Sequence, residues 1–197
     1  VQTCALPICS AVATTFAPIP AARAAQLFRW NRILVRLHGI QALVIVAISP
    51  VASTVKFEGT YPVAKLVDGK FAGLTTGSEP LFAVPLAYVV AAFFGLSALT
   101  HFLVAFPLRA RYEGWLARSH NPMRWAEYAL SSTLMIVAIA SLTSIKDAGA
   151  LIAIAGCNAS MNLFGWSMEE ANIGRKTVQW SHYVFGCIAG IVPWLAI

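Results

Sequence analysis

The sequence has little charge. Only 11% of its 197 residues are Asp, Glu, Lys or Arg, whereas a soluble globular domain carries about 25%. Hydrophobic residues make up 58% of the chain, and the mean hydropathy is +0.71. The basic residues flank apolar runs, a pattern that sets membrane orientation, so the net charge of +6 does not indicate nucleic-acid binding. The composition excludes a soluble domain and predicts a polytopic membrane protein.

Cysteine and metal-ligand patterns are also scarce. The chain has four cysteines and no CxxC pair. Cys157 and Cys187 lie inside apolar segments, where we interpret them as small buried hydrophobes. No nucleophile motif occurs, and no single helix carries His and Glu at a metal-ligand spacing. We therefore expect neither an enzyme nor a metal site.

Ionisable groups are nearly absent from the long apolar segments. Glu127 is the only acid in any of them. An ionisable side chain at such a place is costly unless it has a partner or a task, so Glu127 is the first candidate for a functional residue. All five lysines fall in predicted loops or at helix ends: Lys56, Lys65, Lys70, Lys146 and Lys176.

Five apolar segments predict an all-α membrane protein with five transmembrane helices. A helix rises about 1.5 Å per residue, so about 20 apolar residues cross a bilayer. The third segment has the clearest start, because Asn121 can cap a helix and Pro122 suits its first position. The predicted helices occupy about residues 27–51, 81–106, 122–144, 148–166 and 178–197.

The two ends of the chain carry separate expectations. Val1–Ile8 reads VQTCALPI, which resembles the in-frame translation of a sequencing-library adapter. We expect residues 1–26 to be this scar followed by a mobile Ala/Pro/Thr-rich segment, and residues 27–197 to form the transmembrane domain. The chain stops inside its fifth apolar segment without a polar anchor, which predicts a truncated protein.

The connection between the first two predicted helices contains a hairpin signal. VAKLV and KFAGL flank Asp68-Gly69, a pair that accepts the positive φ angles of a type I′ turn. We expect a β-hairpin outside the lipid, as a cap or a dimer contact. Lys and Arg are in excess at the start of the first helix, from Arg29 to Arg36, and between Arg109 and Arg124, which places the N-terminus in the cytoplasm and the hairpin outside.

Three ionisable residues are predicted at one depth in three helices. With the orientation above, His38, His101 and Glu127 all lie in the cytoplasmic half, and Gln41 follows His38 at an i, i+3 spacing. Histidine titrates near neutral pH and a carboxylate can pair with it, so a proton-exchanging or charge-compensating cluster is one interpretation. The alternative is that these residues lie at the boundary and face water. We favour the cluster.

Small polar residues in the third and fourth segments have two interpretations. Asn158 and Asn162 are one helical turn apart, and Ser131 and Ser132 lie in the preceding segment. They either line a ligand pocket or make hydrogen bonds between helices, a common use of such residues in membrane bundles. The sequence leaves both open.

Five segments carry a family resemblance. FRWNRILVRLHGIQ, FFGLSALTHFLVAF, RWAEYALSSTLMIVAIA, GCNASMNLFGW and FGCIAGIVPW occur in family order over about Leu27 to Ile197 and resemble heliorhodopsins, which are retinal-binding photoreceptors. The resemblance implies the first five helices of a seven-helix rhodopsin-like fold, with helices six and seven missing. It also implies all-trans retinal as a protonated Schiff base, a homodimer in the plasma membrane, a cytoplasmic N-terminus and an undefined signalling partner.

The resemblance assigns roles to residues of this chain. Glu127 would be the Schiff-base counterion, and His38, Gln41 and His101 would line a cytoplasmic polar cavity. The family's retinal-linking lysine belongs to a missing helix, and none of the five lysines here replaces it. The implied retinal pocket consists of Ser131, Met135, Asn158, Met161, Asn162 and Pro193.

Three other functions compete with a photoreceptor. A proton-coupled transporter or channel could use His38, His101 and Glu127. A membrane-embedded enzyme could use His and Glu as acid and base, although no motif supports it. An assembly subunit would use its polar residues only to join helices. Retinal-dependent visible absorption would separate the photoreceptor from all three.

Overall fold

The computed structural model describes residues 16–49 and 53–197 and is mostly helical. Within these described residues, four helices are long and apolar enough to cross a membrane. They are α1 (Ala21–Ile48), α2 (Leu86–Ala105), α4 (Pro122–Leu142) and α5 (Ala148–Asn172). Helix α6 (Ser181–Ala196) is apolar but shorter. The remaining elements are α3 (Arg109–Ala117) and the strands β1 (Thr54–Val67) and β2 (Lys70–Pro85). The predicted helical membrane fold with one hairpin is confirmed.

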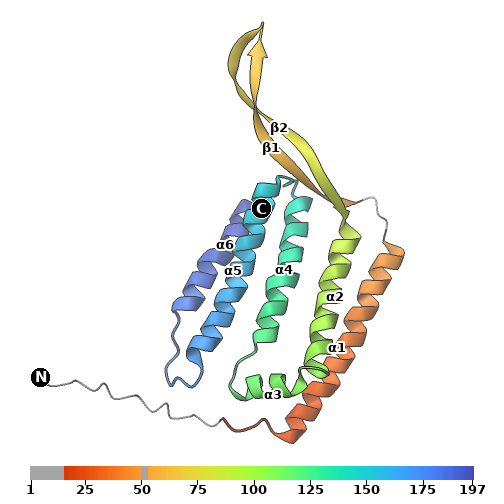
Figure 1. Ribbon diagram of the computed structural model, residues 1–197, viewed down its shortest axis with the longest axis vertical. Coiled ribbons are helices and arrows are strands. Elements are labelled where there is room, and N and C mark those ends of the chain that lie inside the picture. Colours follow the sequence, from red (N-terminus) through yellow and green to blue (C-terminus); the bar gives the residue numbers. More distant parts are fainter. Residues whose placement is uncertain (1–15, 50–52) are drawn as a thin grey trace, which may run out of the picture.

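The four long helices and α6 lie side by side in one row (Figure 1). Each packs against its neighbour in the order α1, α2, α4, α5, α6. Helix α3 runs across one end of the row, and the antiparallel hairpin of β1 and β2 projects from the other end. We call these the α3 end and the hairpin end.

The helices expose large apolar side chains and bury small ones. Leu43 is 72% exposed and Leu195 is 79% exposed, whereas Ala91, Ala138 and Ala140 are buried. A water-soluble bundle would bury its leucines. Lipid tails are as apolar as leucine, so membrane helices gain by packing closely through small residues instead. This distribution, with the four span-length helices, is that of an integral membrane protein.

Helices α4 and α5 begin with side-chain caps and share the main apolar cluster. Asn121 accepts the Arg124 N–H at 3.2 Å and Pro122 occupies the first helical position, as predicted. Asp147 caps α5 by accepting the Ala150 N–H at 2.7 Å. The buried cluster joins α4 to α5 and consists of Ile136, Ala140, Leu151 and Ile154. These contacts hold the central pair of helices in register.

Several predicted helix boundaries are wrong. Helix α1 begins at Ala21 and ends at Ile48, so residues 21–26, which were expected to precede the first helix, are helical. Helix α5 continues to Asn172 and α6 begins at Ser181. The predicted bounds followed apolar runs, but a helix continues into polar sequence once it leaves the lipid. For the same reason the polar α3 was missed. The adapter interpretation of Val1–Ile8 lies outside the described residues.

The hairpin is longer than predicted. Its turn is confirmed, because Asp68 and Gly69 have φ angles of 50° and 74° and connect the paired residues Val67 and Lys70. The pairing continues to Thr54 opposite Pro85, so residues 81–85 belong to β2 and not to the second helix. Hydropathy could not distinguish the two, since LFAVP is as apolar as the helix that follows.

The base of the hairpin is attached to the turn between α4 and α5. The Glu58 N–H donates to the Lys146 carbonyl at 2.8 Å. The Thr60 hydroxyl donates to Asp147 Oδ2 at 2.5 Å, while Oδ1 of the same carboxylate caps α5. Phe57 packs against the apolar cluster of α4 and α5. One carboxylate therefore joins strand β1 to the start of a membrane helix.

This attachment should weaken in acid. The hydrogen bond from Thr60, followed by that from the Ala150 N–H, lowers the pKa of Asp147 from its ordinary 3.8. The folded chain therefore binds this proton less tightly than the unfolded chain. The stabilising contribution is complete above the ordinary pKa and is lost as the pH falls through the lowered pKa. Spin labels on the exposed residues Thr75 and Ile152 should report one narrow distance at neutral pH and a broad distribution in acid.

Two variants at neutral pH test whether the broadening comes from loss of the Thr60–Asp147 contact or from other effects of acid on the protein. Thr60→Val should broaden the distance at neutral pH, whereas Thr76→Val, an exposed position of the same hairpin, should not. If the parent, Thr60→Val and Thr76→Val proteins give the same spin-label distance distribution at neutral pH, the Thr60–Asp147 contact does not fix the hairpin to the helices.

Candidate functional site

Glu127 lies on α4 and faces two hydroxyl groups. Ser97 of α2 donates to Glu127 Oε1 at 2.5 Å, and Ser131, one turn further along α4, donates to the same atom at 3.3 Å. Both serines are buried. Within residues 16–49 and 53–197, no Lys, Arg or His forms an ion pair with Glu127. The site therefore presents a carboxylate held by neutral donors and open to a cation that the described side chains do not supply.

His38 of α1 and His101 of α2 stack on each other. Their ring centroids are 5.7 Å apart and their planes differ by 11°. His38 Nδ1 lies 2.9 Å from Gln41 Oε1, and His101 Nδ1 lies 2.8 Å from Asn31 Oδ1. An amide oxygen only accepts hydrogen bonds, so each Nδ1 carries the proton when the ring is neutral. This tautomer leaves each Nε2 free to accept a proton.

Helix α2 connects the histidine pair to the carboxylate. Ser97 and His101 are one turn apart on it, and they contact Glu127 and Asn31 respectively. The structure thus brings the predicted residues His38, Gln41, His101 and Glu127 into one polar site between α1, α2 and α4. Sequence analysis did not assign Ser97 or the buried Asn31 to the site. Spacing offered a signal, because Ser97 precedes His101 at i, i+4.

A cavity of about 180 Å³ lies beside this site at the α3 end. Glu127, His101 and Asn31 line it, together with Arg124 from α4 and Tyr112 from α3. Burial raises the pKa of Tyr112 above its ordinary value. The volume holds several water molecules, each of which occupies about 30 Å³ in the liquid. The cavity can therefore hydrate the carboxylate and the nearby imidazole.

The asparagines of the predicted retinal pocket join α5 to α4. Asn158 donates from Nδ2 to Ser132 Oγ at 2.8 Å and to Thr133 Oγ1 at 3.0 Å. Asn162 donates to the same Ser132 oxygen at 3.1 Å. These contacts are the interhelical hydrogen bonds that the sequence left open as an alternative. A pocket role for the two residues stays a prediction.

The other predicted pocket residues are dispersed. Ser131 belongs to the carboxylate site, and Met135 is half-buried on α4. Met161 packs against Gly190 of α6, where Pro193 is fully buried. An apolar cavity of about 290 Å³ between α4, α5 and α6 is lined by Met161 and Asn162 but by none of the other four predicted residues. In the described part of the chain, the six predicted retinal-pocket residues do not line a common cavity.

No lysine lies in the helix row. Lys56, Lys65 and Lys70 are in the hairpin, Lys146 is in the turn between α4 and α5, and Lys176 follows α5. A lysine that links retinal must reach the interior of the bundle, so none of the five fits that role. The part of the chain that the structure describes also holds no group of three His, Cys, Asp or Glu side chains placed to bind a metal ion.

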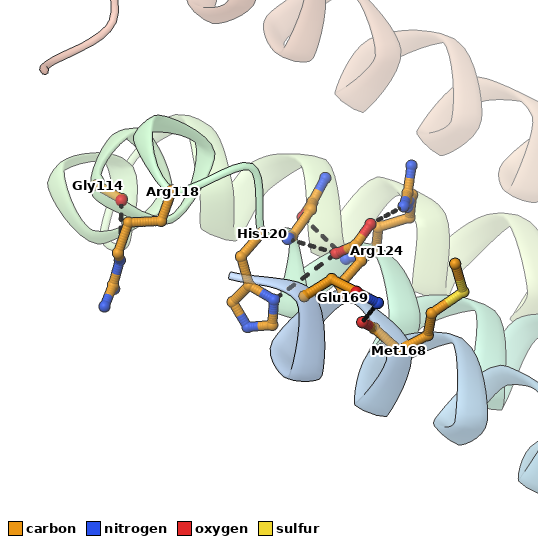
Figure 2. A network of polar contacts seen from close by, with 8 residues as sticks. Gly114, Arg118, His120, Arg124, Met168 and Glu169 are labelled. Atoms are coloured by element: carbon orange, nitrogen blue, oxygen red, sulfur yellow. Dashed lines mark hydrogen bonds and ion pairs between the residues drawn. The ribbon is translucent and has the colours of Figure 1, made fainter. Parts of the chain in front are cut away.

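A second polar cluster lies at the α3 end of the helix row (Figure 2). Glu169, near the end of α5, lies between His120 and Arg124. Its carboxylate pairs with the Arg124 guanidinium and accepts the Asn121 N–H at 2.8 Å. The buried His120 places Nδ1 3.7 Å from Glu169 Oε2. The sequence alone does not indicate this cluster, because Glu169 is 45 residues from Arg124 and lies outside the predicted apolar spans.

The chain matches a known protein family. The family model described as heliorhodopsin matches residues 27–197. No curated protein matches the chain. The matched range begins at Leu27 and includes every helix of the row after the first turns of α1.

Proposed function

Since the chain belongs to the heliorhodopsin family, a family of rhodopsin-type membrane photoreceptors that bind retinal, we propose that Glu127 is the Schiff-base counterion of a light-sensing receptor. The observation that carries this proposal is the environment of the carboxylate. Glu127 is the single acid in the interior of the row, two buried serines hold it, and no described cation pairs with it. A site that provides one uncompensated negative charge suits a cationic ligand.

The residues around Glu127 have complementary roles in this proposal. When bound, retinal supplies a light-absorbing cation as its protonated Schiff base. Ser97 and Ser131 fix the carboxylate so that its charge stays in one place. The His38–His101 pair offers two Nε2 atoms that can take up a proton. Water in the adjoining cavity can connect Glu127 to His101, because both line it.

Covalent attachment requires a lysine from outside these residues. The five lysines lie in the hairpin, in a turn and after α5. We therefore propose that none of these five lysines forms the covalent link to retinal. We also propose that the protein passes a light-driven signal to an unidentified partner.

Reconstitution with retinal tests the proposed function. We expect free all-trans retinal to give no visible pigment band with this chain, because none of its five lysines lies in the helix row. The preformed imine of all-trans retinal and n-butylamine already contains the Schiff-base nitrogen that a lysine would otherwise supply, so it can bind without a lysine. In nanodiscs that contain the protein it should give a visible band of the protonated imine at neutral pH. An imine spectrum identical to that in empty nanodiscs would contradict the proposal.

A proton-coupled transporter or channel is the second candidate. The continuous polar site from Gln41 through the histidine pair to Glu127, with its cavity, favours it. Liposomes with a pH difference separate the two functions. Proton flux in the dark that His101→Phe abolishes would support transport, whereas retinal-dependent absorption without flux would support the photoreceptor.

We also propose that the α3 end faces the cytoplasm of a plasma-membrane homodimer whose hairpins lie outside. Basic residues at the start of α1 and on α3 support this orientation. In a cysteine-free background, Thr75→Cys on the hairpin should react with an impermeant maleimide added to intact cells. Arg111→Cys on α3 should react only after lysis. The reverse labelling pattern would place the N-terminus outside.

A further inference from the structure

Glu169 holds Arg124 at the α3 end of α4. The guanidinium pairs with the Glu169 carboxylate, and that carboxylate also accepts the Asn121 N–H at 2.8 Å. Asn121 is the capping residue of α4 and in turn accepts the Arg124 N–H. The Glu169 side chain is only 21% exposed and has His120 on its other side (Figure 2). The arginine is therefore fixed by a partner on another helix.

Arg124 and Glu127 are neighbours on one face of α4. They are at an i, i+3 spacing, which brings Cβ atoms within about 5–6 Å. Both line the 180 Å³ cavity. A flexible arginine at this position would reach the Glu127 carboxylate, yet its ion pair is made with Glu169. The choice of partner decides whether the negative charge of Glu127 is free or neutralised.

We propose that Glu169 is a positioning residue, which keeps Arg124 away from Glu127 so that the counterion charge stays available to the ligand. This inference rests on the proposed function, since it takes Glu127 as the counterion. Glu169 does not itself line the cavity beside Glu127. Of the three residues that it contacts, Arg124, Asn121 and His120, Arg124 is the one that brings a fixed positive charge to that cavity.

A purely structural clamp is the competing explanation. Glu169 joins the loop before α4 to the end of α5, and its loss could simply loosen this end of the bundle. The two explanations differ when Arg124 is absent. If Glu169 only joins the two helix ends through the Asn121 N–H, Glu169→Gln should change the spectrum whether or not Arg124 is present. If Glu169 positions Arg124, Glu169→Gln should have no effect once Arg124 has been replaced.

The test is a double-substitution cycle read by visible absorption of the butylimine pigment. In Glu169→Gln the released Arg124 should pair with Glu127 and weaken the counterion. The band should move to the red, and the apparent pKa of the Schiff base should fall by about one unit or more. Arg124→Gln/Glu169→Gln should restore both values to those of Arg124→Gln alone. Glu169→Asp, which keeps the charge, should recover part of the parent behaviour.

The controls distinguish this inference from the proposed function. Glu170→Gln removes the exposed neighbouring charge and should leave the band unchanged. If Glu127→Gln shifts the spectrum but Glu169→Gln does not, the positioning role is wrong and the counterion stands. An equal shift for Glu169→Gln with and without Arg124 also overturns it. If Glu127→Gln itself has no effect, the counterion assignment fails, and the positioning role fails with it.

Discussion

Glu127→Gln should shift the protonated pigment to the red and lower the apparent pKa of its Schiff base. Gln keeps the size of the side chain and an oxygen that can accept from Ser97 and Ser131, so the change removes mainly the charge. An opposite charge favours the charged form of a titrating group, and its loss lowers that pKa by about 1–3 units. We expect this variant to have the larger of the two spectral effects at this site.

The colour shift follows from the same charge. A carboxylate beside the Schiff base stabilises its positive charge most in the ground state, because excitation moves that charge along the polyene. Removing the carboxylate therefore raises the ground state more than the excited state and narrows the gap between them. Because Coulomb energies are large in a low-dielectric interior, the effect should be easily resolved.

The measurement is a pH series of absorption spectra for the parent and Glu127→Gln pigments, compared only where the Schiff base is protonated. Asp68→Asn is a suitable control, since it removes a carboxylate at the tip of the hairpin and tolerates the positive φ there. A Glu127→Gln pigment with the parent's maximum and titration would exclude Glu127 as the counterion.

Gly165→Ala should have the largest effect on stability. A Cβ atom at Gly165 would lie 2.7 Å from Trp125 Cε3 and still closer to two other atoms of the ring. The indole lies directly over the glycine and joins α4 to α5, so it must move to admit the methyl group. Overpacking of this kind costs about 1–3 kcal/mol. We expect a lower unfolding temperature in lipid nanodiscs and a change in the indole emission.

Gly156→Ala is the matched control on the same helix. No atom lies within 4 Å of a Cβ built there, and the residue is exposed. The substitution should be neutral or should stabilise α5 by up to about 1 kcal/mol, because alanine loses less backbone entropy than glycine. Unfolding temperatures that change equally for both variants would show that the contact with Trp125 does not govern the packing of α4 on α5.

Local features were predictable because they depend on adjacent residues. The Asp68-Gly69 turn follows from positive φ angles that few residues adopt. The cap at Asn121 and Pro122 follows from the unpaired N–H groups of a first turn. Helix ends were less predictable: the last turns of α5 are polar, and residues 81–85 are apolar but pair with β1. Hydropathy reports lipid contact and does not report backbone conformation.

By itself, the sequence determined the membrane class, the hairpin turn and the one acid that needs a partner. Each of these is a property of composition or of a few consecutive residues. Only the tertiary structure determined which hydrogen-bond and ion-pair partners the polar side chains have. Ser97 reaches Glu127 across 30 residues, and Arg124 pairs with Glu169 across 45. Such choices depend on how each helix is rotated about its axis and on where its neighbours end, and a rotation of one helix by a fraction of a turn would replace these pairs with others.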